Sequence, residues 1–202
     1  PAYPNPRYPN TTSVVEMRQA IAYLNDRGQL LTIIGAGYYS PLYTVVPPVY
    51  GVMAHPEIKP GGAREDLTYP YSRINAEAKL DAGHFPVGGD GWRYWDLPPY
   101  NPGGPRGAED LNLNLKIFIR SDDSHRRDYG TWLANEIEAA HVHVTRTLGT
   151  SGAGKIQWML NKDSNLYTAG WGLGVDPDHV ILWNWDFYWH PGSSLNTAGC
   201  ND

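Results

Sequence analysis

Apolar residues recur at helical spacing near the start of the chain. Measured from Met17, the others lie three, four or seven positions away, which places all five on one helix face, and they are Val14, Met17, Ala20, Ile21 and Leu24. Ser13 and Glu16 have the spacing of a capping box, so the pattern predicts an amphipathic helix that begins at Ser13. Further helices are predicted over residues 29–34 and residues 72–82, and Gly83 is expected to close the second of these.

Alternating polarity predicts a strand in the second half of the chain. Apolar residues occupy every other position of residues 111–119, as in a strand with one buried face. A helix of about 16 residues is predicted next, with caps offered by residues 121–124, and a strand follows over residues 142–147. Strand, helix and strand form a βαβ unit, whose two strands should be parallel. A helix over residues 155–160 and a short strand over residues 166–169 are expected to extend the same sheet, so the predicted class is α/β.

Proline and glycine predict long loops between these elements. The 202 residues include 22 glycines and 17 prolines, without the three-residue repeat of collagen. Residues 1–12 are rich in proline and asparagine and are expected to be an extended lead-in to a single unit that covers residues 1–202. Residues 36–66 are expected to be loop-like, because their prolines block helix and central strand alike.

Charge and cysteine content exclude several classes of protein. Lys and Arg number 16 against 21 Asp and Glu, and the net charge of −5 gives no attraction to nucleic acid backbones or anionic membranes. No run approaches the roughly 18 apolar residues of a membrane span. Cys200 is the only cysteine, which excludes an internal disulfide and a cysteine-built zinc site.

Residues 149–155 match most of a phosphate-binding loop. Glycines and Lys155 follow a predicted strand, where backbone N–H groups and a lysine can hold phosphates. The match is incomplete, because Ile156 stands where such a loop has the Ser or Thr that binds magnesium. The two interpretations are nucleotide binding, as in a nucleotide hydrolase, and a flexible glycine loop.

Two histidines and two aspartates are weaker candidates for chemistry. His141 and His143 lie two apart on a predicted strand, so both rings would face one side and could supply two ligands of a zinc site. No third ligand lies at a spacing typical of zinc sites. Asp122 and Asp123 are explained as helix caps. Without a nucleophile elbow or a zinc-protease motif, we expect no enzyme activity, metal or cofactor.

The glycine-rich stretch after the last predicted strand is the strongest candidate site. Gly170 and Gly172 let backbone approach a ligand, and Trp171 between them offers a flat apolar face. Asp176 and Asp178 follow, and ligands of open α/β sheets collect outside the carboxyl ends of strands. The alternative is a Trp packed on the sheet, with the two acids opening a helix.

Short motifs recur along the chain in a recognisable order. They are residues 17–23 with 26–27, residues 43–48, residues 69–71 with 76–80, residues 82–83 with 89–91, residues 120–122 with Arg126, residues 170–171 with 176–178, and Asn196 with Gly199. In this order and spacing they resemble the family 5 extracytoplasmic solute-binding proteins of ABC transporters, the dipeptide, oligopeptide and nickel binders. Each block alone is weak, and their shared order over nearly the whole chain is specific.

The resemblance implies one lobe of a two-lobed, type II periplasmic binding protein, with a mixed sheet flanked by helices. Family members are much longer than this chain, which resembles their carboxy-terminal lobe, so a fragment or excised lobe is expected, with a natural half-length protein as the alternative. The implied partners are the missing amino-terminal lobe, an ABC permease and a peptide or other small solute. The clamp would capture its ligand outside the cytoplasmic membrane, in the periplasm or on the outer face, without chemistry.

A second function is also compatible with the sequence. A cell-surface structural or assembly protein could retain the lobe fold without transport, and the 8 Trp and 14 Tyr residues would suit its interfaces.

The resemblance also implies roles for individual residues. Trp171 would contact or cover the ligand. In peptide binders of the family, an aspartate three residues after this Trp holds the ligand's α-amino group, and here that position is Gly174. Recognition of a free amino terminus would therefore need Asp176 or Asp178. Trp183 is expected to line an aromatic pocket, with packing in the core or between lobes as the alternative.

Overall fold

The computed structural model describes residues 11–34, 39–44, 47–97, 106–107, 110–161 and 163–170. Its α-helices are α1 (Val15–Tyr23), α2 (Arg27–Ile33), α3 (Arg73–Ala82), α4 (Ser124–Ala139) and α5 (Ser151–Lys155). Its strands are β1 (Tyr94–Trp95), β2 (Leu111–Asn112), β3 (Asn114–Arg120), β4 (His143–Gly149) and β5 (Leu166–Tyr167). Short helical turns are η1 (Thr11–Ser13), η2 (Pro48–Met53), η3 (Glu65–Thr68) and the π-helical η4 (Ile156–Leu160).

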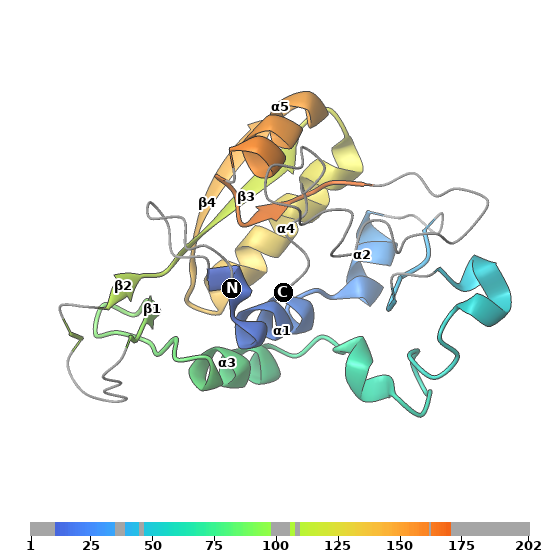
Figure 1. Ribbon diagram of the computed structural model, residues 1–202, viewed down its shortest axis with the longest axis horizontal. Helices are drawn as coiled ribbons and strands as arrows, with labels where there is room; N and C mark the ends of the chain where they lie inside the picture. Colours follow the sequence, from blue (N-terminus) through green and yellow to red (C-terminus); the bar gives the residue numbers. More distant parts are fainter. Residues whose placement is uncertain are drawn as a thin grey trace.

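The predicted βαβ unit is confirmed. β3 pairs in parallel with β4 along its whole length and with β5 on its other side, so the order is β4-β3-β5. Leu113 alone separates β3 from β2, which pairs antiparallel with β1. The mixed strand directions thus belong to two small sheets, one parallel and one antiparallel, and the α/β class is confirmed. Figure 1 shows α4 and α5 beside the parallel sheet, with α1 and α3 side by side below it.

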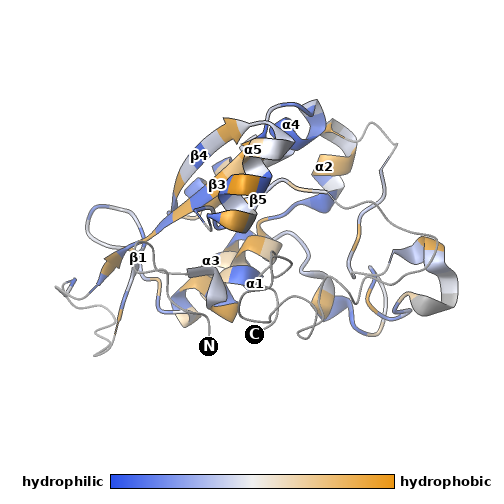
Figure 2. Cartoon of the chain, turned by 45° about the horizontal axis from the view of Figure 1, so that its top comes forward, coloured by the Kyte–Doolittle hydropathy of each residue, from blue (hydrophilic) through white to orange (hydrophobic). Residues whose placement is uncertain are grey.

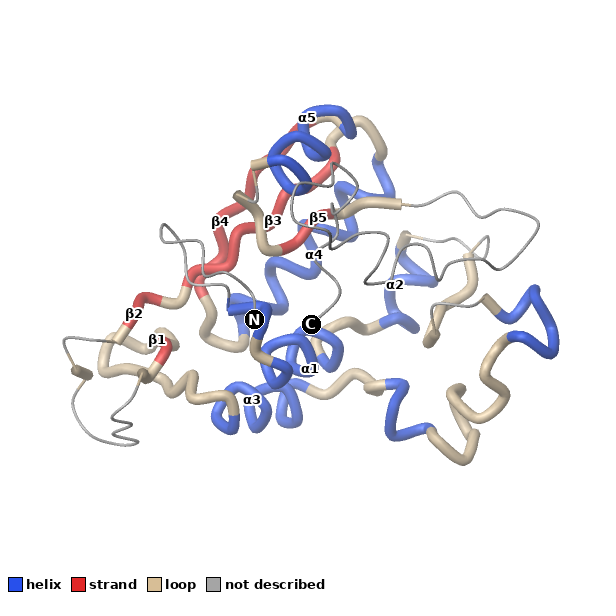
Figure 3. The backbone as a smooth tube through the Cα atoms, in the orientation of Figure 1, coloured by secondary structure: helices blue, strands red, loops and turns tan. Residues whose placement is uncertain are grey.

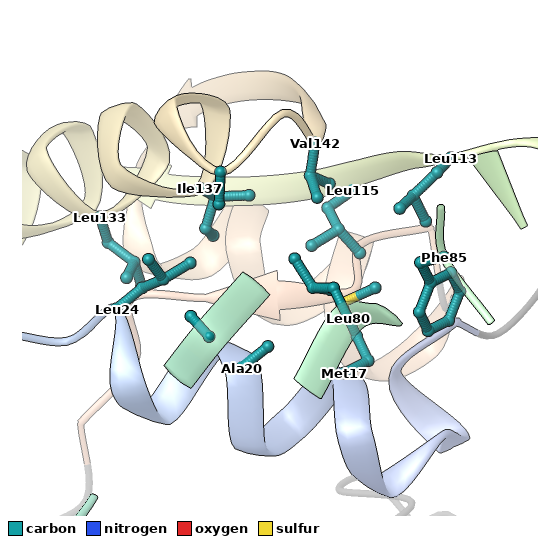
Figure 4. Close-up of a cluster of buried hydrophobic side chains, with 12 residues drawn as sticks. Met17, Ala20, Leu24, Leu80, Phe85, Leu113, Leu115, Leu133, Ile137 and Val142 are labelled. Carbon is teal, nitrogen blue, oxygen red and sulfur yellow. The ribbon is translucent and has the colours of Figure 1, made fainter. Parts of the chain in front are cut away.

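The main core lies between α4 and β3 on one side and α1 and α3 on the other (Figure 4). Its labelled side chains are Met17, Ala20, Leu24, Leu80, Phe85, Leu113, Leu115, Leu133, Ile137 and Val142. Each fully buried aliphatic side chain contributes roughly 1.5–3 kcal/mol to folding. The amphipathic face predicted for the first helix is therefore the face that is buried.

Polar side chains set several helix starts. Ser72 accepts a hydrogen bond from the Asn75 N–H (3.2 Å) at the start of α3, and Asp123 accepts one from the Arg126 N–H (3.1 Å) at the start of α4. Both helices therefore begin where the sequence predicts, and α3 ends at Ala82 before Gly83.

The capping box predicted at Ser13 was wrong, and α2 starts two residues earlier than predicted. α1 begins at Val15 and not at Ser13, because residues 11–13 form η1 and the Val14 N–H donates to the Thr11 carbonyl (3.3 Å). α2 begins at Arg27, before the predicted residue 29, because Asp26 accepts a hydrogen bond from the Gln29 N–H (2.9 Å). Among the described residues of the predicted loop over residues 36–66, those outside η2 and the start of η3 form neither helix nor strand (Figure 3).

Hydropathy along the chain agrees with this arrangement. Figure 2 shows hydrophobic residues on β3 and α1 and a mixture of hydrophobic and hydrophilic residues on α4. Within the described ranges, no helix is both long and apolar enough to cross a membrane.

Candidate functional site

The structure describes the sheet edge from which the candidate site continues, but not most of the site itself. Gly170 is described. The other predicted ligand-binding residues lie outside the described residues, and they are Trp171, Gly172, Asp176, Asp178 and Trp183, together with Gly174. The carboxyl edge of the parallel sheet is therefore defined here as residues 120–126, 149–151 and 168–170.

Thr168 holds the chain at this edge after β5. Its buried hydroxyl accepts a hydrogen bond from the Arg120 N–H (2.9 Å), and its own N–H donates to the Phe118 carbonyl (3.1 Å). These bonds continue the pairing with β3 beyond the end of β5. Gly170 therefore leaves the sheet from a fixed position.

Gly170 lies against the Arg126 guanidinium. Arg126 donates from Nε to the Asp123 carboxylate (3.0 Å) and from a terminal nitrogen to the Ala169 carbonyl. A Cβ atom on residue 170 would overlap the Arg126 guanidinium unless that side chain moved. The close approach that the structure shows at Gly170 is to Arg126, and contact with a ligand stays a prediction.

A second ion pair lies beside the first. Arg120 donates to both carboxylate oxygens of Asp122, at 2.9 and 3.2 Å, and the Ser151 N–H donates to the same carboxylate at 3.1 Å. The hydrogen bonds from Arg120 and then from Ser151 lower the pKa of Asp122 from 3.8 to about 2. The Arg126 N–H and side chain also lower the pKa of Asp123, so both acids carry a negative charge near neutral pH.

The predicted glycine loop is a helix. Residues 151–155 form α5, capped by Thr150, whose side chain accepts from the Ala153 N–H and whose carbonyl accepts from the Gly154 N–H. The Asp122 carboxylate occupies the Ser151 N–H that a phosphate would need, and it would repel an anion. The nucleotide interpretation therefore does not fit this geometry, and the flexible-loop interpretation was wrong.

Tyr39 and His125 join this edge from distant parts of the sequence. The Tyr39 hydroxyl lies 3.1 Å from His125 Nδ1, and the rings meet edge to face with centroids 5.5 Å apart. His125 lies in the first turn of α4, while Tyr39 belongs to the proline-rich loop and is 53% exposed. No local pattern could have paired these residues, because 86 positions separate them.

The two histidines do not share a strand face. His141 precedes β4 with a positive φ of 66°, and its Nδ1 lies 2.9 Å from the Gly91 carbonyl oxygen. The His143 ring, on β4, stacks on Trp92 with centroids 3.8 Å apart. Both therefore contact the turn at residues 88–92. In the part of the chain that the structure describes, no three His, Cys, Asp or Glu residues are grouped to hold a metal ion.

Comparison with solved structures identifies the fold. NikZ from Campylobacter jejuni, in complex with Ni(L-His), matches 92% of this chain with a TM-score of 0.66 and 20% identity. Lactococcal OppA, complexed with an endogenous peptide in the closed conformation, matches 93% with a TM-score of 0.66 and 16% identity. The chain has the fold of a solute-binding protein lobe. The neighbours are family 5 solute-binding proteins, so the resemblance read from the sequence is confirmed at the level of the fold.

The length of the match agrees with a single lobe. The chain spans 32% of NikZ and 31% of OppA, about a third of these two-lobed proteins. The periplasmic oligopeptide-binding protein TM1223 of Thermotoga maritima, with mannohexaose bound, matches 88% of the chain with a TM-score of 0.61 and 18% identity, over 29% of its own length. No family profile and no curated protein matches the sequence. Neighbours with this lobe thus hold a metal complex, a peptide or an oligosaccharide.

Proposed function

We propose that this solute-binding lobe captures a peptide or other small solute outside the cytoplasmic membrane for import by an ABC transporter. The observation that supports the proposal most is the fold match over 92% and 93% of the chain to proteins with bound Ni(L-His) and a bound peptide. The partners of the lobe would be an amino-terminal lobe and an ABC permease. Binding would involve no covalent chemistry.

The carboxyl edge would form this lobe's share of the ligand site. Ligands of open α/β sheets bind outside the carboxyl ends of the strands, which is where Gly170 leaves the sheet. Trp171 would cover the ligand, and Gly172 would allow its backbone to approach. Ligand would stabilise the closed clamp through its greater affinity for that state.

The described charges at this edge balance one another. Arg120 is paired with Asp122, and Arg126 is paired with Asp123, so these four residues carry no net charge together. Asp176 and Asp178 would then supply the uncompensated charge, and a charge-assisted hydrogen bond to an α-amino group is the interaction they suit. The proposed ligand is therefore a peptide. Asp176 or Asp178 would take the role of the aspartate that peptide binders have at the position of Gly174.

The test is mass spectrometry followed by calorimetry. Native mass spectra of the purified protein should show co-purified solute, and calorimetry with the identified solute should show weaker binding for Asp176→Ala or Asp178→Ala. Asp128→Ala is the matched control, because Asp128 is exposed on α4 and pairs with Arg127. Unchanged affinity in both site variants would contradict the assignment of these acids. Defined oligomers by light scattering, with no bound solute, would favour the surface-assembly alternative.

A further inference from the structure

Strand β4 lies at the outer side of the parallel sheet (Figure 3). It pairs with β3 along all 7 of its residues in an unbroken register. In the part of the chain that the structure describes, no strand pairs with its other side. The sheet therefore ends in a long edge at β4, whereas β5 on the opposite side of β3 has only 2 residues.

The hydrogen bonds of β3 show which backbone groups of β4 point outward. The Ser121 N–H donates to the Gly149 carbonyl (2.9 Å), so the backbone of Gly149 faces β3. Successive residues of a strand direct their N–H and C=O groups to opposite sides. The backbone groups of Val144, Arg146 and Leu148 therefore point away from β3, and among the described residues they have no partner. These outward groups of residues 144–148 are called the β4 edge.

The β4 edge lacks the features that usually protect an exposed strand from pairing. Such strands carry Pro, Lys or a bulge, but residues 143–149 contain neither Pro nor Lys, and their register has no bulge. Arg146 is neutralised within the chain, because it donates to both Glu138 carboxylate oxygens (3.0 and 2.6 Å) and to the Asn135 side chain (2.9 Å). Leu148 is 57% exposed. The β4 edge is thus open to pairing with another strand.

The side chains along the β4 edge have the same order in both directions. Residues 144–148 are apolar, Thr, Arg, Thr and apolar in turn. In antiparallel pairing about a two-fold axis at residue 146, Val144 of one copy lies opposite Leu148 of the other, and Thr145 lies opposite Thr147. Apolar pairs and Thr–Thr pairs of this kind stabilise antiparallel strands. The β4 edge is therefore complementary to itself.

We propose that the β4 edge binds a second copy of this chain through antiparallel pairing of residues 144–148. The outward groups of Val144, Arg146 and Leu148 would make about six main-chain hydrogen bonds across the axis, and the two parallel sheets would become one continuous sheet. Because the two β4 strands run in opposite directions, the carboxyl edges of the two copies would lie at opposite ends of the joined sheet. The two ligand sites would therefore stay separate.

Sedimentation velocity of the purified chain tests the association. The contact is small, so we expect a dissociation constant on the order of 100 μM, with monomer at about 5 μM and mostly dimer at about 1 mM. A monomer at about 1 mM would overturn the proposal. Open-ended growth beyond the dimer would also overturn it, because a two-fold contact uses the same surface on both copies and closes.

Hydrogen exchange identifies the surface that pairs. The N–H groups of Val144, Arg146 and Leu148 should exchange quickly at about 5 μM and more slowly at about 1 mM. Slow exchange already at the low concentration would show that another segment of the same chain covers the β4 edge, and it would refute the proposal.

Two leucine variants locate the contact. Leu148→Lys places a charge opposite Val144 of the other copy, so it should weaken the dimer at least about tenfold, and its exposed position should leave the thermal midpoint unchanged. Leu160→Lys is the matched control, because it makes the same change at a 67% exposed leucine on η4, outside the β4 edge. Equal weakening by the two variants would refute the β4 edge as the contact.

Arg146→Cys tests the two-fold axis. In a Cys200→Ser background, residue 146 would face its own copy at a Cα separation of about 5.5 Å, which suits a disulfide, so mild oxidation should cross-link the dimer. Asp128→Cys, at an exposed position on α4, is the control, and equal cross-linking at both positions would contradict the axis. Asp178→Ala should leave the dimer unchanged, and Leu148→Lys should leave solute binding unchanged. Failure of this proposal is therefore distinguishable from failure of the transport function.

Discussion

Arg93 should be one of the most important side chains for stability outside the apolar core. It is buried, with 3% of its side chain exposed. Nε donates to the Ala140 carbonyl (3.0 Å), and one terminal nitrogen donates to the Phe85 carbonyl (2.5 Å) and to the Asp81 carboxylate (2.5 Å). A single guanidinium thus ties the ends of α3 and α4 to each other.

The cost of removing this guanidinium follows from its partners. Arg93→Met keeps most of the apolar stem but leaves two carbonyl groups without their donor, at about 1–3 kcal/mol each. Asp81 is 63% exposed, so loss of the ion pair adds at most about 1 kcal/mol. We expect the free energy of unfolding to fall by about 3–5 kcal/mol, which lowers the melting temperature by about 2–4 °C per kcal/mol in a chain of this size.

Urea unfolding of Arg93→Met beside Arg64→Met is the assay. Arg64 pairs with Asp66 on the surface, where the two side chains are 50% and 65% exposed, so its loss should cost less than about 0.5 kcal/mol. If the two variants differ by less than about 1 kcal/mol, the reasoning about the buried carbonyls is refuted.

Three further predictions concern single residues. Gly154→Ala should destabilise the protein by about 1–3 kcal/mol, because a Cβ would come within 2.5 Å of Tyr167 and 2.8 Å of Phe118. On the same helix, a Cβ at Gly152 would meet only Thr150 Oγ1, at an ordinary contact distance of 4.0 Å, so Gly152→Ala should stabilise by up to about 1 kcal/mol. Thermal unfolding of the two variants compares them. The folded pKa of Asp122 is about 2 against an ordinary 3.8, so its contribution to stability is complete above about pH 5 and is lost as pH falls toward 2. An acid titration in which Asp122→Asn shows the same pH dependence as the parent would contradict this. Burial raises the pKa of the Tyr129 hydroxyl above its ordinary 10.0. The unfolded state therefore loses this proton at a lower pH than the folded state, and the free energy of unfolding falls as pH rises through 10. Tyr129→Phe should lessen this loss in urea titrations at alkaline pH, and an equal loss in the variant would count against the reasoning.

Much of the fold could be predicted because its signals are local. The alternation over residues 111–119 specified β3, and Ser72 with Gly83 specified both ends of α3, since side-chain period and capping depend on neighbours in sequence. The order of short motifs predicted the lobe fold that the comparisons show. The start of α1 was wrong because η1 competes with the capping box for the same residues.

The sequence by itself determined the βαβ unit, α3 and the α/β class, and only the tertiary structure decided what several other residues do. Glycines are poor helix formers, so the glycines of residues 149–155 predicted a loop. The structure instead has helix α5 there, and Gly154 is required because Phe118 and Tyr167 leave no space for a side chain. The contact between Tyr39 and His125 joins segments that are far apart in the chain. Such contacts depend on how elements pack in space, and a pattern of neighbouring residues carries no information about that.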